Sequence, residues 1–178
     1  MSNKAERVLN SIKNSCSNEI YDDITLKIGG LSEKPSIAKQ GKYIKALLEE
    51  LSSRCGIETA EKIMRSCGHQ CLSDKTIKTV KALYEKSENV PEFLKLLNDN
   101  HIGGGNLHMK DNKIIGVYDM CYCGIPKATK SMPPEYCECS AGWLEKLFSS
   151  AFEKEVTVKK IYTILKGDDK CTFEITYL

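Results

Sequence analysis

The sequence predicts an α+β protein in which a helical N-terminal half packs on a small antiparallel sheet, with a helix and a hairpin at the C-terminal end. Apolar residues recur with a period near 3.6 through the first hundred residues, which indicates amphipathic helices. A glycine triplet at 103–105 ends that pattern, and two β-branched and aromatic stretches follow it. We expect a single domain over 1–178, with a mainly helical part (1–100) and a mixed part (101–178).

The expected helices of the N-terminal half start and stop at residues suited to those positions. The first covers Ala5 to Cys16. Pro35 fits the first residue of the next, which extends to Arg54, because a helix start has no use for the N–H that proline lacks. Residues 21–30 end in two glycines and are expected to form a short extended piece or a loop. Further helices are expected over 57–67, 73–84 and 91–99, with Gly68 as a stop, Ser73 as a cap and Pro91 as an opening residue.

The C-terminal part alternates between strand and loop patterns. Residues 106–120 alternate around Asp111-Asn112, which predicts a β-hairpin. The cysteine-rich segment 121–139 has little periodicity and is expected to be a loop. Ser140 should cap a helix over 141–152. Two final stretches, 156–165 and 171–178, predict a second hairpin through a turn that contains glycine and aspartate.

Composition excludes several functional classes. The net charge of +2 is too small to favour a nucleic-acid or membrane partner. The first residues lack the apolar core of a signal peptide, and no apolar run approaches the roughly 18 residues of a membrane span. We therefore expect a cytoplasmic protein. Its nine cysteines then require an explanation, because a reducing cytosol does not favour structural disulfides and the count is odd.

Two closely spaced cysteine pairs suggest a metal site. Cys121 and Cys123 flank one residue, as do Cys137 and Cys139, and a loop rich in glycine and proline separates the pairs. Two such pairs can converge on one tetrahedral ion, and the metal would supply the free energy that orders the loop. Two alternatives stay open, namely buried cysteines that act as small apolar side chains and a redox dithiol.

A second cysteine group surrounds a glycine. Cys67 and Cys71 are four residues apart and would share a helix face if the helix continued past Gly68, which we expect to end it. Both can contribute to the same centre or to another one. His69 fits a solvent-exposed or hydrogen-bonded polar residue better than a ligand. The cysteines outside both groups, at positions 16 and 55, fit core positions.

The choice of metal is between zinc and an iron–sulfur cluster, because thiolates suit both. A closed site of four thiolates would be structural. A site with three protein ligands would leave a coordination position open for another molecule.

Residues 136–175 resemble the C-terminal half of 4-vinyl reductase domains. The resemblance rests on a cysteine, a Gly-aromatic pair, a strand and a terminal Cys-x-Phe string. The matching positions are Cys137, Gly142-Trp143, Phe152, Val156, Gly167 and 171–175. The string at 167–173 is also similar to that of L-2-amino-thiazoline-4-carboxylic acid hydrolase relatives, although we find no matching internal catalytic Cys-Asp element.

The resemblance implies a ligand-binding fold shared with nitric-oxide-sensing and Golgi-transport proteins, and a zinc site. It places zinc ligands at Cys137 and Cys171. The family's Glu-x-x-Cys would fall on Lys160 and Thr163, which are poor zinc ligands. The resemblance therefore implies that Cys139, Cys121 or Cys123 replaces them, or that the metal has moved.

Three functions compete on the sequence alone. The first is a metal-binding module or sensor for a small-molecule ligand, in which Trp143 forms either a pocket wall or a core anchor. The second is an enzyme that uses a metal or a reactive cysteine, such as Cys67 or Cys71, on a small substrate. The third is an interaction protein with a structural metal. A homodimer is compatible with all three. The metal-ligand candidates are Cys67, Cys71, Cys121, Cys123, Cys137, Cys139 and Cys171.

Overall fold

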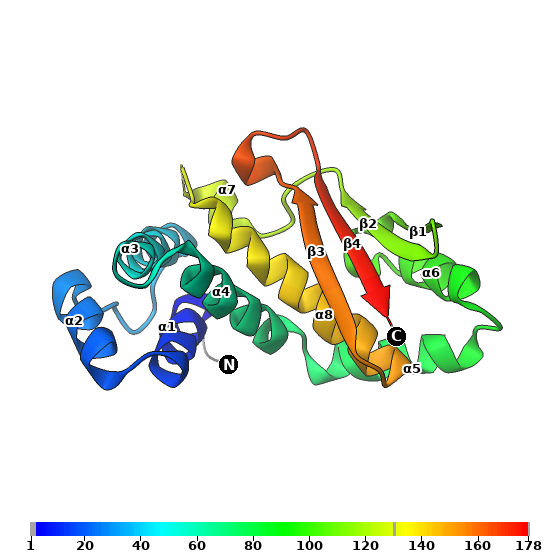
Figure 1. The fold of residues 1–178 in the computed structure, drawn as a ribbon, viewed down its shortest axis with the longest axis horizontal. Coiled ribbons are helices and arrows are strands. Elements are labelled where there is room, and N and C mark those ends of the chain that lie inside the picture. The colour runs from blue at the N-terminus through cyan, green and yellow to red at the C-terminus, as the bar shows by residue number, and fades with distance from the viewer. Residues whose placement is uncertain (1–2, 130, 178) are drawn as a thin grey trace.

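The computed structural model describes residues 3–129 and 131–177 (Figure 1). The helices are α1 (Lys4–Ser15), α2 (Asn18–Ile28), α3 (Ile37–Cys55), α4 (Ile57–Cys71), α5 (Asp74–Lys86), α6 (Val90–Asp99), α7 (Gly124–Ala128) and α8 (Glu138–Phe152). The strands are β1 (Leu107–Lys110), β2 (Lys113–Tyr118), β3 (Val156–Tyr162) and β4 (Cys171–Tyr177), and short 3-10 turns cover Ile102–Gly105, Pro134–Cys137 and Ile164–Lys166.

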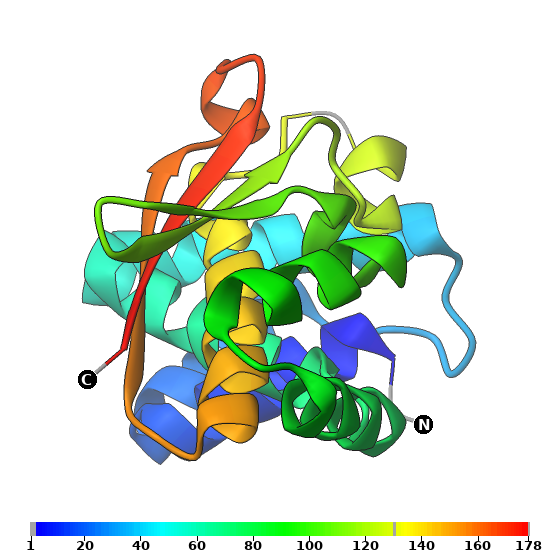
Figure 2. The same ribbon diagram turned by 90° about the vertical axis from the view of Figure 1, so that its right-hand side faces the viewer.

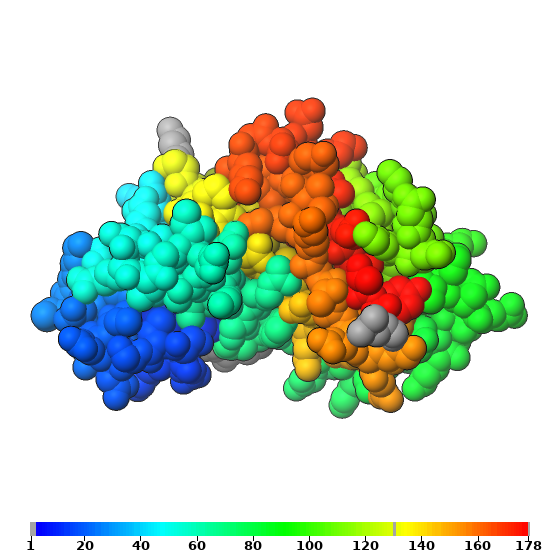
Figure 3. Space-filling model, in the orientation of Figure 1, coloured from blue at the N-terminus to red at the C-terminus, as the bar shows by residue number. Residues whose placement is uncertain are grey.

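Two cores lie side by side along the molecule. Helices α1 to α4 form one end, and the sheet with α5 and α6 forms the other, with α8 between them (Figures 1 and 2). The first core includes Leu47 and Leu51, and the second surrounds Phe93, Phe148 and Phe173. In the space-filling view the two ends meet along α4 and α8 (Figure 3). Of the helices in the described part of the chain, none combines the length and apolar character of a membrane span.

The sheet confirms the predicted α+β class. Its order is β1-β2-β4-β3, and every neighbouring pair is antiparallel. Asp111 and Asn112 connect β1 to β2, and both have a positive φ, as a two-residue hairpin turn requires. The second predicted hairpin forms as β3 and β4. Leu178, included in that prediction, lies outside the described residues, as does Lys130 of the predicted loop.

The segment 21–30 is helical, so the prediction of an extended piece or loop was wrong. The Ser17 hydroxyl accepts the N–H of Ile20 and caps α2, and Gly29, with a φ of 79°, ends it. Ile24 is fully buried in the N-terminal core. The two glycines correctly mark the end of a helix, but the residues before them were not predicted to be helical.

Two predicted helix boundaries in the centre of the molecule were also wrong. Helix α4 continues through Gly68 to Cys71. Helix α8 begins at Glu138, because the 3-10 turn Pro134–Cys137 leads directly into it, and Ser140 lies inside the helix rather than at its cap. The segment expected to be a loop also contains α7.

Two glycines let α4 and α8 cross with their backbones in contact. A Cβ added at Gly68 would overlap the carbonyl oxygen of Cys139, and one added at Gly142 would overlap that of Arg65. Gly68 therefore serves close packing of two helices rather than helix termination. The crossing joins the two cores.

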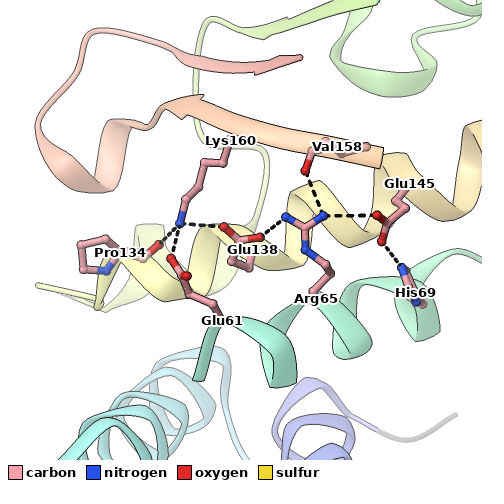
Figure 4. Close-up of polar contacts among 8 residues, drawn as sticks. All are labelled: Glu61, Arg65, His69, Pro134, Glu138, Glu145, Val158 and Lys160. Atoms are coloured by element: carbon pink, nitrogen blue, oxygen red, sulfur yellow. Dashed lines mark hydrogen bonds and ion pairs between the residues drawn. The ribbon is translucent and has the colours of Figure 1, made fainter. Parts of the chain in front are cut away.

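A buried ion network ties the same two helices to β3 (Figure 4). Glu138 is 5% exposed, and its carboxylate pairs with Arg65 and with Lys160, whose Nζ lies 2.9 Å from Glu138 Oε1. Arg65 also pairs with Glu145 and donates to the carbonyl oxygen of Val158. Each charge at the helix–strand junction thus has a partner.

We expect Lys160→Met to lower the free energy of unfolding by about 2 kcal/mol, because it removes one of two cations from a buried carboxylate. The surface pair of Lys27 and Glu50 provides the control, since the Lys27 side chain is 63% exposed. Lys27→Met should change stability by less than about 0.5 kcal/mol. Urea denaturation of both variants measures the difference, and equal losses would contradict a structural role for the network.

A candidate metal centre beside a cavity

Three thiols meet where α4 crosses α8. Cys67 and Cys71 lie one helical turn apart on α4, and Cys139 lies in the first turn of α8. Their sulfur atoms all lie within 4.8 Å of one another, and Cys71 and Cys139 are 4.0 Å apart. A tetrahedral zinc–thiolate site needs roughly 3.8 Å between sulfurs, given Zn–S bonds of about 2.3 Å. Within residues 3–129 and 131–177, no other three His, Cys, Asp or Glu side chains meet in this way.

A lysine from the first helix contacts two of these sulfurs. Lys4 Nζ lies 2.6 Å from Cys139 Sγ and 3.2 Å from Cys71 Sγ. The ring of Tyr136 lies below the ammonium group, at 5.5 Å from its centroid. Burial lowers the pKa of Lys4, but the charges of the cysteines outweigh it and raise the pKa above its usual range. Lys4 therefore stays charged at the thiols.

The thiols themselves differ in acidity. Hydrogen bonds from two neighbours, Cys139 first and then Cys67, hold the pKa of Cys71 well below its usual range. The Lys4 charge acts in the same direction. The pKa of Cys67 is raised, because its thiol donates to Cys139 and Cys71. Cys71 is therefore the most acidic of the three thiols, and a thiolate is the form that binds metals.

A cavity of about 520 Å³ opens next to the thiols. Cys71, Cys139, Cys123 and Lys4 are among the residues that line it. Elements of both cores contribute to its wall, because the cavity lies at the N-terminal end of α8, where the two cores meet. Its volume is within the range of small-molecule sites in proteins.

The lining of the cavity is also aromatic and rich in glycine. Tyr118, Tyr122 and Trp143 line it, together with Gly103 and Gly104. Both glycines have a positive φ, and a Cβ at Gly104 would overlap the Tyr118 ring. The glycine triplet is therefore part of the cavity wall. Trp143 lines the cavity and also packs on the C-terminal core, so it fits both the pocket-wall and the core-anchor interpretation.

The four cysteines of segment 121–139 do not converge. Cys137 and Cys139 are two residues apart at the start of α8, which turns their side chains roughly 200° apart around the helix axis. Cys139 faces α4, whereas Cys137 is hydrogen-bonded to Cys171. Cys123 Sγ lies 3.0 Å from the Tyr136 hydroxyl, on the same cavity but outside the three-thiol group.

The pair of Cys137 and Cys171 lies where the family resemblance would place zinc ligands. The hydrogen bond from Cys137 lowers the pKa of Cys171 to about 6. The third family position holds Lys160, which is engaged by carboxylates. The fourth holds Thr163, whose hydroxyl is buried without a partner among the described residues. Cys121 completes the list of predicted ligands, and its thiol donates to the Cys123 carbonyl over 3.8 Å.

Three residues considered from the sequence lie outside the three-thiol group, and one residue that contacts it, Lys4, was not predicted. His69 is hydrogen-bonded to Glu145 at 2.8 Å and is half exposed, as a polar surface residue would be. Cys16 and Cys55 pack on the N-terminal core. Nothing in the sequence singles out Lys4, because one lysine among many carries no pattern and its sulfur contacts span 67 and 135 positions.

Comparison with known proteins identifies a family and a fold. Residues 2–178 match the model of a family described as "Family of unknown function (DUF6144)". No curated protein matches the chain. An H-NOX protein from Shewanella oneidensis in the Fe(II)NO ligation state aligns at 11% identity and a TM-score of 0.52, over 100% of this chain and 99% of that one.

Two further solved structures are similar at low identity. A variant H-NOX domain from Shewanella oneidensis in the Fe(II)CO ligation state aligns at 12% identity and a TM-score of 0.52, over 99% of this chain and 98% of that one. A vinyl-4-reductase family protein from Methanocaldococcus jannaschii aligns at 16% identity, over 100% and 97%, with a TM-score of only 0.33. The H-NOX alignments show a shared fold, which agrees with the predicted α+β class.

Proposed function

The chain belongs to the DUF6144 family, and we propose that it is a sensor-like domain that binds a small molecule and holds zinc at Cys67, Cys71 and Cys139. The observation that carries this proposal is the meeting of three thiols, from two helices, beside a cavity of about 520 Å³. The proposed site does not include the other predicted ligands, which are Cys121, Cys123, Cys137 and Cys171.

The arrangement of the sulfurs supports a single ion. Sulfurs within 4.8 Å of one another match the spacing around one tetrahedral metal. In a [4Fe–4S] cluster each thiolate binds a different iron atom, so the cysteine sulfurs lie further apart, and both [2Fe–2S] and [4Fe–4S] clusters usually use four cysteines. Zinc is therefore the proposed metal, and an iron–sulfur cluster is the alternative.

The charge around the thiols also supports a bound cation. Three thiolates and one divalent ion carry a net charge of −1, and Lys4 is positioned to cancel it. A lysine next to thiolates favours their deprotonated form, which metal binding requires. Lys4 would thus stabilise the loaded site without being a ligand.

The fold supports the small-molecule part of the proposal. The H-NOX structures are described with iron ligated by NO or CO, so that fold holds small molecules in those proteins. This chain offers sulfur ligands, and His101 is the one histidine that lines the cavity in the described part of the chain. We therefore propose zinc rather than the iron of those proteins.

Metal analysis and an absorption spectrum of protein purified without oxygen test the proposal. We expect colourless protein with about one zinc per chain. Removal of zinc by a chelator should lower the melting temperature by roughly 5–15 °C, because bound metal stabilises only the folded state. Brown protein with iron and sulfide would support the alternative cofactor. Protein without metal, even after reconstitution, would contradict both.

A second candidate function is a cysteine-dependent enzyme. The contact of 3.2 Å between Lys4 Nζ and Cys71 Sγ favours it, because Cys71 lines the cavity and a neighbouring cation activates a thiolate nucleophile. Iodoacetamide labelling followed by peptide mapping distinguishes the two. Rapid labelling of Cys71 in protein as purified would favour the enzyme, whereas labelling only after chelation would favour the metal site.

A further inference from the structure

The cavity is lined both by thiols of the three-thiol group and by aromatic side chains, and we propose that a small neutral nitrogen heterocycle binds there, with one ring nitrogen at the open coordination position of the metal. This inference rests on the proposed zinc site. It names the chemical class of the ligand, which the proposed function leaves open.

The open position faces the cavity. Three protein ligands leave one position of a four-coordinate zinc ion unfilled. Cys71 and Cys139 line the cavity, whereas Cys67 is fully buried behind them. The Lys4 ammonium also lines the cavity and contacts the two cavity-facing sulfurs. A molecule in the cavity would therefore reach the metal beside the Lys4 ammonium.

The aromatic part of the lining suits a flat ring. Tyr118 and Tyr122 pack edge to face, with their ring centroids 5.5 Å apart. The Tyr122 hydroxyl donates to the Gly104 carbonyl over 3.1 Å and fixes a ring that is otherwise 55% exposed. Trp143 adds a third aromatic surface. Aromatic side chains in such an arrangement favour stacked or edge-on contact with another ring.

The charges favour a neutral donor. Three thiolates, a divalent ion and Lys4 sum to zero. Lys4 is the one lysine, arginine, aspartate or glutamate that lines the cavity in the described part of the chain. An anionic donor would leave an uncompensated charge in a partly enclosed site, which is unfavourable. A neutral ring nitrogen suits zinc, and the Ser140 hydroxyl and His101 can hydrogen-bond to a second heteroatom.

Cys123 is the competing occupant of the open position. Its sulfur lines the cavity but is held 3.0 Å from the Tyr136 hydroxyl and is not within the three-thiol group. A movement of this side chain to the metal would close the site. The variant Cys123→Ser separates the two arrangements.

Cobalt(II) in place of zinc makes the test visible, because cobalt–thiolate absorption bands respond to the fourth ligand. Titration of the cobalt protein with benzimidazole should give a saturable change in these bands, and Cys123→Ser should retain it. Thiocyanate, an anionic donor, should bind at least about tenfold more weakly. Tyr122→Ala should weaken benzimidazole binding roughly three- to tenfold without loss of cobalt. Tyr162→Ala, which changes an exposed tyrosine of β3, should leave it unchanged.

The outcomes separate the two proposals. If no cobalt binds, the metal site itself fails and the heterocycle site fails with it. If cobalt binds but benzimidazole changes no band in the parent protein or in Cys123→Ser, only the heterocycle site is overturned. A response that appears in Cys123→Ser alone shows that Cys123 fills the fourth position and also overturns it. Tighter binding of thiocyanate than of benzimidazole would overturn the choice of a neutral ligand.

Discussion

Zinc content should fall from about one ion per chain to near zero when Cys139 is replaced by serine. Cys139 is the ligand that α8 contributes, so its loss leaves only the two thiols of α4. Structural zinc sites have binding free energies of about 10–16 kcal/mol, shared among few ligands, so removing one should weaken binding at least about a hundredfold. Competition with a chromophoric chelator measures the affinity, and elemental analysis measures the content.

Cys171→Ser is the matched control. It makes the same chemical change at another buried cysteine, which is hydrogen-bonded to Cys137 rather than to the three-thiol group. This variant should retain zinc with an affinity within about threefold of the parent protein. The reverse result, with zinc lost in Cys171→Ser and kept in Cys139→Ser, would place the metal at the position that the 4-vinyl reductase resemblance implies.

Local signals in the sequence were sufficient for most of the fold. The turn at Asp111-Asn112 predicted the first hairpin, because few residue pairs accept a positive φ at both positions. Ser73 caps α5 as expected, and Pro91 lies in the first turn of α6. These features depend on neighbours within a few residues, so the sequence alone determines them.

The candidate site could be predicted only in part, because it depends on contacts between distant segments. The spacing of Cys67 and Cys71 is visible in the sequence, but intrinsic propensity made Gly68 a helix stop, whereas packing against α8 retains it inside the helix. The adjacency of Cys137 and Cys139 suggested a shared ion. Once both lie at the start of a helix, they face different partners. No pattern in the sequence indicates the tertiary contacts of Lys4.

The second large effect concerns the glycine crossing that brings the thiols together. We expect Gly142→Ala to lower the free energy of unfolding by about 3 kcal/mol, and the melting temperature by roughly 6–12 °C. The added Cβ would overlap the carbonyl oxygen of Arg65, which is backbone and cannot move aside without separating α4 from α8. Zinc affinity should fall too, because Cys139 lies one turn before Gly142. Thermal denaturation and the chelator competition measure both losses.

The direction of the stability change in Gly142→Ala distinguishes the helix crossing from helix propensity. In an unhindered helix, alanine stabilises by about 1 kcal/mol relative to glycine, so a net loss isolates the crossing. Gly30→Ala, where nothing lies within 4 Å of the added Cβ, should change stability by less than about 0.5 kcal/mol. Gly68→Ala should resemble Gly142→Ala, because it meets the backbone of Cys139 and Trp143. The double variant should lose less than the sum of the two, because the separation forced by one Cβ relieves the overlap of the other. Additive losses would mean that the two glycines act independently, and an unchanged zinc affinity in both single variants would mean that the crossing does not position the three thiols.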